Sequence, residues 1–119
     1  MTRKKINMRP AASDAVKVLG QQIKQARFDR DWSVVDAAAR AGISPVTFTS
    51  IEAGTGTTSI GTVFHVAALL GVPLFTSTDP NEIARMRYSG ERDMGLLKSR
   101  AGGVLKRSRG KVASDGYPA

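Results

Sequence analysis

Residues 44–58, SPVTFTSIEAGTGTT, carry short hydroxyl and methyl side chains at close spacing. The hydroxyls of Thr49 and Ser50 can donate to or accept from base edges or phosphates, and Val46 and the methyl of Thr47 can contact thymine methyl groups. Such contacts discriminate weakly, because a hydroxyl can pair with several base edges. Each hydroxyl alone is more often a helix cap or a solvated side chain. If a helix displays them together on one exposed face, they indicate contact with nucleic acid.

Residue types for metal binding or covalent catalysis are scarce. The chain has no cysteine and one histidine, His65, which excludes thiolate ligands, a cysteine nucleophile and a histidine cluster. We interpret His65 as a surface or boundary side chain. The acids Asp29, Asp31 and Asp36 alternate with Arg30 and a helix start, so a cap and a solvated turn are preferred to a metal site. With neither a phosphate loop nor a nucleophile elbow, the sequence predicts no enzyme, metal or cofactor.

Positive charge is concentrated at the two ends of the 119-residue chain, whose formal net charge is +8. Residues 1–10 contain four cations and no acid, residues 11–80 five cations and six acids, and residues 81–119 nine cations and four acids. Basic ends around a nearly neutral domain suit a polyanion, most often nucleic acid. Solubilising tails are the alternative. An N-terminal arm lying along a DNA groove would use Arg3, Lys4 and Lys5.

The chain length suits one compact domain with a modest core and tails. No run of 18 apolar residues occurs, and no apolar segment follows the basic MTRKKINMRP at the N-terminus. Neither a membrane span nor a signal peptide is therefore predicted. A cytoplasmic protein is the expectation.

Cap signals and apolar spacing predict the first two helices. The first covers residues 14–28 with Ser13 or Asp14 as its cap. Its apolar face consists of Val16, Leu19, Ile23, Ala26 and Phe28. The second helix begins after Ser33, with Asp36 completing a capping box, and ends at Gly42 in a left-handed turn.

Three further helices follow. Ser44 and Pro45 start a helix that runs to about Ala53 and ends at Gly54. The next helix, residues 60–70, has Ile60, Val63, Phe64, Ala67 and Leu70 on one face. Residues 79–82 cap a last helix whose length is left open by Gly90 and Gly95.

These elements predict an all-α bundle of about five helices. The predicted organisation is a basic arm over residues 1–12, a domain over 13–78, a helical extension over 79–100 and a basic, flexible tail over 101–119. The tail has little apolar content and several glycines.

A steep angle between the second and third helices follows from the spacing of five residues. Ala38 has a small side chain where the two helices approach most closely, and Gly42 makes the turn. Ile43 fills the space between the two helices, and Phe48 and Ile51 form the buried inner face of the third helix. A lone glycine would be weak evidence, but this complete set is a specific signal for a helix-turn-helix.

Residues 19–74 resemble the XRE-type helix-turn-helix domain of Cro/cI-like phage repressors and their bacterial relatives. The matching features are Leu19-Gly20, Ile23, Arg27, Ser33, Ala38, Arg40 to Ser44, Thr47, Ile51-Glu52, Gly54 and Leu70 to Val72. The resemblance implies a five-helix, lambda-repressor-like fold. The loop after the third helix and the closing GVPLF most resemble HipB-like antitoxins.

The resemblance also implies roles for particular residues. It implies a buried ion pair between Arg27 and Glu52, whereas the sequence alone favours two surface charges. It places the start of the third helix in the DNA major groove and the second helix across the backbone. The implied DNA contacts are Ser33, Val34, Arg40, Ser44, Pro45, Val46, Thr47, Thr49, Ser50 and the loop residues Thr55, Thr57 and Thr58.

Three positions depart from the family pattern. The family usually has Gln or Arg at Pro45 and Val46, and a phosphate-binding Gln at Val34. Bidentate reading of bases is therefore not expected there, and base contact is expected to shift to Thr47, Thr49 and Ser50.

The predicted function is a DNA-binding transcriptional repressor that binds a palindromic operator as a homodimer. The narrower resemblance implies a HipB-like antitoxin that autoregulates its operon and neutralises a HipA-like kinase toxin. The alternative is a protein-interaction module whose helix-turn-helix no longer reads bases and whose basic tail acts on a partner protein. The residues at Val34, Pro45 and Val46 favour the alternative, whereas the cationic ends and the helix-turn-helix spacing favour the repressor.

Overall fold

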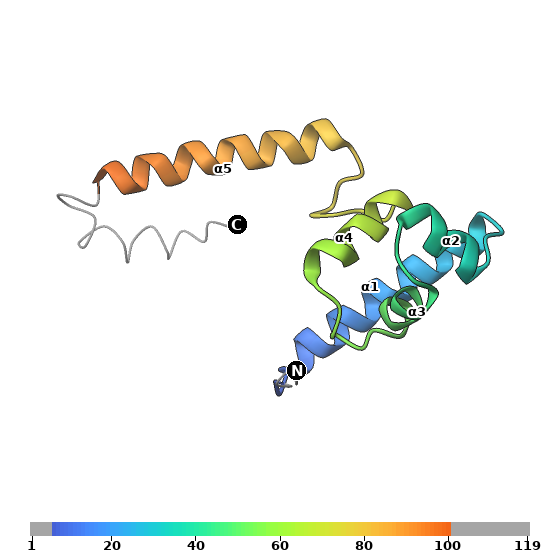
Figure 1. The fold of residues 1–119 in the computed structure, drawn as a ribbon. Coiled ribbons are helices and arrows are strands. Elements are labelled where there is room, and N and C mark those ends of the chain that lie inside the picture. The colour runs from blue at the N-terminus through green and yellow to red at the C-terminus, as the bar shows by residue number, and fades with distance from the viewer. Residues whose placement is uncertain (1–5, 101–119) are drawn as a thin grey trace. The chain divides into compact units, whose positions relative to one another are not determined.

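The computed structural model describes residues 6–100, with side chains as far as Lys98. This part of the chain contains five α-helices (Figure 1). The helices are α1 (Pro10–Asp29), α2 (Val34–Ala41), α3 (Pro45–Ala53), α4 (Ile60–Leu69) and α5 (Pro80–Arg100). The prediction of an all-α fold with five helices is confirmed. The basic residues of the predicted arm, Arg3, Lys4 and Lys5, and the predicted tail lie outside the described residues.

The chain divides into two units. Helices α1 to α4 belong to a unit that ends at Thr78, and α5 belongs to a second unit that begins at Asp79. None of the helices within residues 6–100 is long and apolar enough to cross a membrane.

Helix α1 begins earlier than the sequence predicts. Its N-cap is Arg9, which makes no side-chain capping bond, and Pro10 occupies the first turn. The backbone N–H of Ser13 already donates to Arg9 O at 3.0 Å, so the predicted cap at Ser13 or Asp14 is wrong. Proline is favourable here because its missing N–H has no helical partner at this position. Residues 10–12, which the sequence places in the arm, are therefore helical.

The caps of α2 and α3 lie where they are predicted. Ser33 and Asp36 form a complete capping box at the start of α2, and Ser44 Oγ accepts from Thr47 N at the start of α3. Both helices end at a left-handed glycine, Gly42 with φ 76° and Gly54 with φ 69°. These local signals fix the bounds of the helix-turn-helix.

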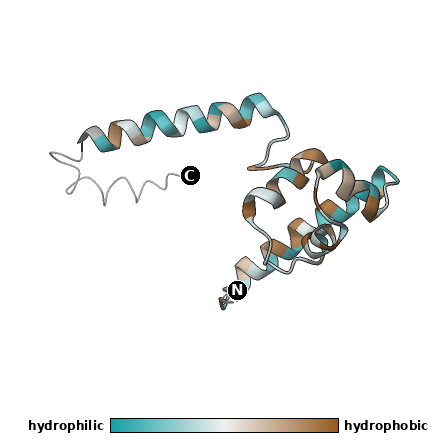
Figure 2. Cartoon of the chain, in the orientation of Figure 1, coloured by the Kyte–Doolittle hydropathy of each residue, from teal (hydrophilic) through white to brown (hydrophobic). Residues whose placement is uncertain are grey.

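The core of the first unit is made by inner faces of α1 to α4 and the residues after α4. Its buried apolar members are Ile23, Ala37, Ala38, Ala41, Phe48, Ile51, Val66, Ala67, Leu70 and Val72. Figure 2 shows hydrophobic segments along α2, α3 and α4, whereas α5 is mostly hydrophilic with separated apolar residues. Alanines on α2 let the neighbouring helices approach it closely.

Two residues of the predicted apolar faces are exposed. Phe28 is 53% exposed at the end of α1, and its ring lies 4.7 Å from the guanidinium carbon of Arg27, an arrangement suited to cation–π attraction. Ile60 is 71% exposed because it lies in the first turn of α4, beyond the edge of the core. Val66 is fully buried instead and continues the inner face of α4.

A tight turn follows α4. Leu74 and Ser77 exchange two backbone hydrogen bonds of 2.8 and 3.0 Å, across Phe75 and Thr76, which both have positive φ. Phe75 packs edge-on against Phe64 of α4, with ring centroids 6.0 Å apart. The periodicity of the sequence does not predict this turn.

Helix α5 is continuous through both of its glycines. Asp79 starts it as predicted, because its Oδ1 accepts from Asn81 N at 2.9 Å. Glycine lowers helix stability by about 1 kcal/mol without preventing helix formation. The length of this helix, which the sequence left open, is 21 residues.

Candidate nucleic-acid interface

The orientation of α3 is set by a backbone contact with α1. A Cβ atom at Gly20 would lie 2.6 Å from Ile51 O and 2.7 Å from Glu52 O, a spacing that no side chain can occupy. At the other end of the contact, a Cβ at Gly54 would lie 2.7 Å from Lys17 Cα. The two glycines therefore allow α1 and the C-terminal half of α3 to touch main chain to main chain.

A buried ion pair reinforces the same contact. Arg27 Nε donates to Glu52 Oε2 at 2.7 Å and Nη2 donates to Glu52 Oε1 at 3.1 Å, with both side chains 8% exposed. Arg27 Nη1 also donates to Trp32 O at 2.9 Å, in the α1–α2 connection. The hydrogen bond to Glu52 raises the pKa of Arg27, an effect that burial partly opposes. The pair that the resemblance implies is thus present, and it joins three segments.

The outward face of α3 is apolar and hydroxylic. Pro45, Val46 and Thr49 are exposed, and Val46 is 79% exposed. Together with Ser50, Ala53 and Thr55 they line a shallow hollow along the helix. No side chain with an amide or a guanidinium projects from this helix, whose sequence is PVTFTSIEA. The face can therefore offer methyl groups and hydroxyls to a DNA groove.

Several hydroxyls of the predicted site already have partners within the chain. Ser44 Oγ donates to Thr47 Oγ1 at 3.0 Å, in addition to accepting from Thr47 N. Ser50 Oγ lies 3.3 Å from Thr55 Oγ1, which lies 3.0 Å from Thr57 Oγ1. These bonds hold the helix start and the following loop in place. Thr47 and Ser50 are half-buried, so Thr49 is the exposed hydroxyl of this helix.

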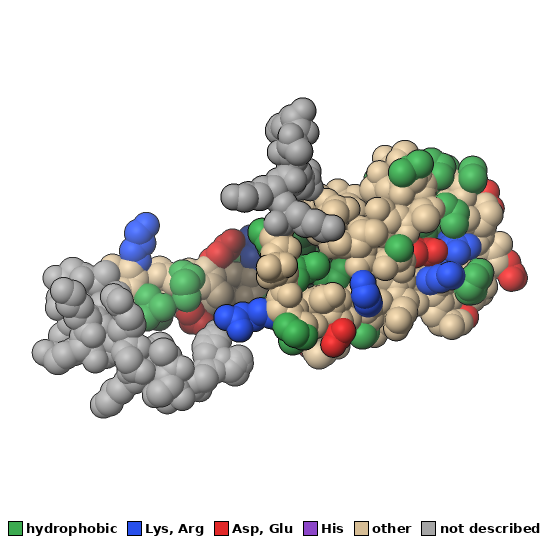
Figure 3. Space-filling model, turned by 90° about the horizontal axis from the view of Figure 1, so that it is seen from below, with side chains coloured by type: hydrophobic (Ala, Val, Ile, Leu, Met, Phe, Trp, Pro, Cys, Tyr) green, Lys and Arg blue, Asp and Glu red, His purple; other side chains and the backbone are tan. Residues whose placement is uncertain are grey.

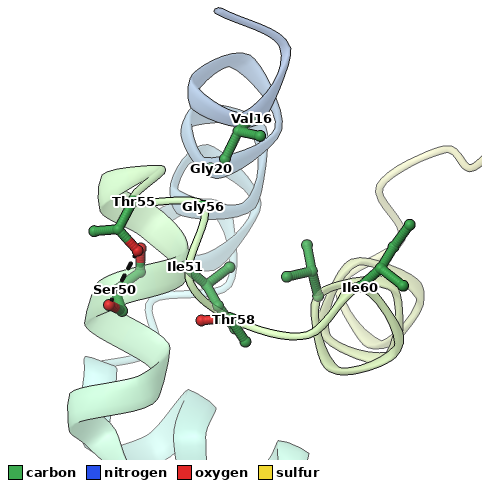
Figure 4. A pocket seen from close by; sticks show the side chains of 9 residues that line it. Val16, Gly20, Ser50, Ile51, Thr55, Gly56, Thr58 and Ile60 are labelled. Carbon is green, nitrogen blue, oxygen red and sulfur yellow. Dashed lines mark hydrogen bonds between the residues drawn. The ribbon is translucent and has the colours of Figure 1, made fainter. Parts of the chain in front are cut away.

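A cavity of about 210 Å³ lies beside the C-terminal half of α3 (Figure 4). Figure 4 shows the hydrogen-bonded Ser50 and Thr55 on one side of it and Ile60 on the other. Its lining comes from α1, α3, the loop and α4, namely Val16, Gly20, Ser50, Ile51, Thr55, Gly56, Thr58, Ile60 and Val63. The loop therefore connects α3 to α4 and leaves this cavity open beside α1.

The predicted contacts on α2 have structural roles as well. Ser33 is occupied in the capping box. Val34 is half-buried and packs against the core, and its side chain offers no polar group to phosphate. Arg40 is exposed, and its guanidinium carbon lies 4.3 Å from the centre of the Trp32 ring. Stacking fixes the Arg40 side chain and leaves its edge available for phosphate.

Charged side chains of the first unit are scattered. Figure 3, seen from below, shows blue and red side chains interspersed with green and tan surface on this face. The described residues contain no group of three or more His, Cys, Asp or Glu that could hold a metal ion. Arg3, Lys4 and Lys5 at the N-terminal end and the basic residues after residue 100 lie outside the described residues.

The connection between α2 and α3 is three residues long. Residues 18–74 match a family model described as a helix-turn-helix domain. This stretch is a helix-turn-helix domain. No match was found among curated proteins or among solved structures. A helix-turn-helix domain suggests DNA binding and a role in transcription regulation.

Three contacts within the helix-turn-helix domain were missed by sequence reasoning. The close approach at Gly20 depends on the path of α3, and the Trp32 ring also receives Arg30, whose guanidinium carbon lies 5.6 Å from its centre. His65 Nε2 lies 3.0 Å from Ala41 O and thereby links α4 to the end of α2. Only the glycine carried a local signal, since a glycine inside a helix often marks a close approach.

Proposed function

We propose that the protein is a transcriptional repressor that reads DNA through the exposed methyl and hydroxyl face of α3. The observation that carries the proposal is the exposure of Val46 and Thr49 on a helix whose two ends are capped and whose inner side is fixed by the Arg27–Glu52 pair. A rigid helix of this kind can present its outer face to the major groove without further ordering.

The proposed reading favours thymine methyl groups. Val46 supplies an apolar contact at the start of α3, and Thr49 supplies a methyl and a hydroxyl one turn later. Arg40, Ser33 and Thr55 would contact the backbone, and the basic chain ends would add sequence-independent attraction. One such helix covers few base pairs, so we propose that two copies bind a palindromic operator.

A gel shift with full-length protein tests this proposal. The probe is duplex DNA from immediately upstream of the protein's own gene, with a scrambled duplex of equal length beside it. Val46→Ala and Thr49→Ala should each weaken binding to the upstream DNA by about 1 kcal/mol, roughly fivefold, and leave the scrambled duplex unaffected. Gln22→Ala, an exposed position on α1, is the matched control. Equal losses on both duplexes would contradict base reading by α3.

The finer proposal is that the repressor is a HipB-like antitoxin. It is supported by the resemblance of the loop after α3 and of GVPLF, residues 71–75, to that group. In this role the protein would bind a HipA-like kinase toxin and repress their shared operon. Co-expression with the product of the adjacent gene and co-purification at high salt tests it. A neighbouring frame unrelated to a kinase, or a kinase that does not bind, would leave repression without the antitoxin role.

The second candidate function is a protein-interaction module that does not read bases. It is favoured by the packing of Val34 against the core and by the absence of amide or guanidinium groups on the outer face of α3. In that case the gel shift would show equal, salt-sensitive binding to any duplex. Val46→Ala and Thr49→Ala would then change neither probe.

A further inference from the structure

Helix α5 carries an apolar face, and no second helix or strand covers it within the described residues of its own unit. Within residues 79–100, α5 is the whole secondary structure. Met86 and Met94 are 40% and 58% exposed, and together with Gly90 they line a shallow hollow along the helix. In Figure 3 apolar and charged side chains are both visible on the surface of α5.

Such a helix needs a partner for its stability. Isolated helices are marginal in water even when alanine-rich, and interior glycines cost about 1 kcal/mol each. Helix α5 contains two of them, Gly90 and Gly95. Its intrinsic helix preference is therefore weak, and packing of its apolar face must supply the remainder.

The apolar face is symmetric about Gly90. Met86 and Met94 lie four residues before and after it, and Ile83 and Leu97 lie seven residues before and after it. A helix turns by about 100° per residue, so these positions deviate from the Gly90 direction by only about 40° and 20°. They form one stripe along α5.

This symmetry fits a second copy of the same helix running in the opposite direction. When two antiparallel copies cross at Gly90, residues whose numbers are equally distant from it lie at the same height. Ile83 of each copy then faces Leu97 of the other, and Met86 faces Met94. The two Gly90 residues meet at the crossing, where the missing side chains allow close approach.

The charges beside the stripe select the antiparallel direction. Arg87 and Glu91 lie on the same edge of the stripe and form an ion pair of 2.9 Å within the helix. In an antiparallel pair like edges face each other, so Arg87 of one copy lies within about 3 Å, along the axis, of Glu91 of the other. In a parallel pair the edge that carries Arg87 and Glu91 would face the opposite edge of the other copy. That arrangement would place Glu91 beside Asp93 and bring two negative charges together.

We propose that α5 is a homodimer seam in which two copies pair antiparallel about a two-fold axis at Gly90. The interface is isologous, as expected for a two-fold dimer. Two apolar layers flank the crossing on each side, and the Arg87–Glu91 pairs extend across the edge. The seam would supply the dimer that operator binding requires, but its test uses no DNA.

Single cysteines test this arrangement directly, because the chain contains none of its own. Residue 90 lies opposite its copy, with Cα atoms within about 5 Å, a separation suited to a disulfide. Gly90→Cys should cross-link under mild oxidation at micromolar protein about a thousandfold faster than Tyr88→Cys, since a paired thiol experiences a millimolar effective concentration. Tyr88 is 60% exposed on the opposite side of α5 and is the matched control.

A second pair of variants tests the direction. Ile83→Cys alone and Leu97→Cys alone should remain uncross-linked, whereas their mixture should give the heterodimer. Self-cross-linking of Ile83→Cys would show a parallel pair and overturn the proposal. Sedimentation equilibrium of the unmodified chain without DNA should give twice the chain mass. A monomer at micromolar concentration, as expected if α5 packs on its own chain, would also overturn it, whatever the outcome of the gel shift.

Discussion

Gly20 of α1 lies so close to Ile51 of α3 that a Cβ atom at position 20 would be 2.6 Å from the Ile51 carbonyl oxygen. The obstacle is backbone on both sides, so it cannot be relieved by a change of rotamer. Substitution at this position must displace one helix relative to the other.

We expect Gly20→Ala to lower the free energy of unfolding by about 1–3 kcal/mol, the usual cost of overpacking. Urea unfolding followed by circular dichroism measures the change. The matched control is Gly61→Ala in α4, where an added Cβ meets nothing within 4 Å. Alanine there should leave stability unchanged or raise it by about 0.5–1 kcal/mol, because alanine favours helix. Equal effects at both positions would contradict the close contact.

Glu52→Gln should destabilise the domain by about 3–5 kcal/mol, because Arg27 would keep a buried charge without its counter-charge. The raised pKa of Arg27 means that its contribution is complete below the ordinary pKa of arginine and is lost only as the pH rises through the higher folded value. Arg27 therefore stays protonated at every pH used for ordinary melts, and the substitution leaves its buried charge unpaired. Asp29→Asn, which changes an exposed carboxylate at the end of α1, is the control and should change stability by at most about 0.5 kcal/mol.

Alanine substitutions at Gly42 and Gly54 distinguish the cost of backbone strain from the cost of steric overlap. Both have positive φ, but a Cβ at Gly42 meets nothing within 4 Å, whereas one at Gly54 meets Lys17 Cα. Gly42→Ala should cost about 1–2 kcal/mol from conformation alone. Gly54→Ala should cost about 1–3 kcal/mol more, since overpacking is added. Melting temperatures that rank the two variants in the reverse order would refute this account.

Affinity for duplex DNA should fall steeply with salt, because cationic chain ends release counterions from DNA. Replacing Arg3, Lys4 and Lys5 by Gln together should reduce the slope of log K against log salt by up to about 2.7, if all three contact phosphate. Fluorescence anisotropy over a range of salt concentrations measures the slope. An unchanged slope would show that the N-terminal residues make no phosphate contact.

Features with a local cause could be predicted from the sequence. The caps at Ser33 and Ser44 and the turns at Gly42 and Gly54 depend on a few neighbouring residues, and they lie as predicted. The start of α1 had its own signal in Pro10, but Ser13 and Asp14 competed with it. The limits of each helix follow mostly from such short-range chemistry.

Features that depend on tertiary contacts could not be predicted. Phe28 and Ile60 fit the helical period, yet they are exposed, because the neighbouring elements end before reaching them. In the candidate interface, the exposure of Val46 and Thr49 follows from the period of α3. The engagement of Thr47 with Ser44 and of Ser50 with Thr55 depends on side-chain geometry and on the path of the loop.

The main-chain contact of α1 with α3 has a consequence for how this domain can change its preference for DNA. Since Gly20 and Gly54 fix α3 through backbone atoms, the position of the helix does not depend on which side chains occupy its outer surface. Residues 45, 46 and 49 can therefore be exchanged for longer, hydrogen-bonding side chains while the helix stays in the same place. New sequence preferences are accessible to this scaffold through substitutions that leave its folding energy almost untouched.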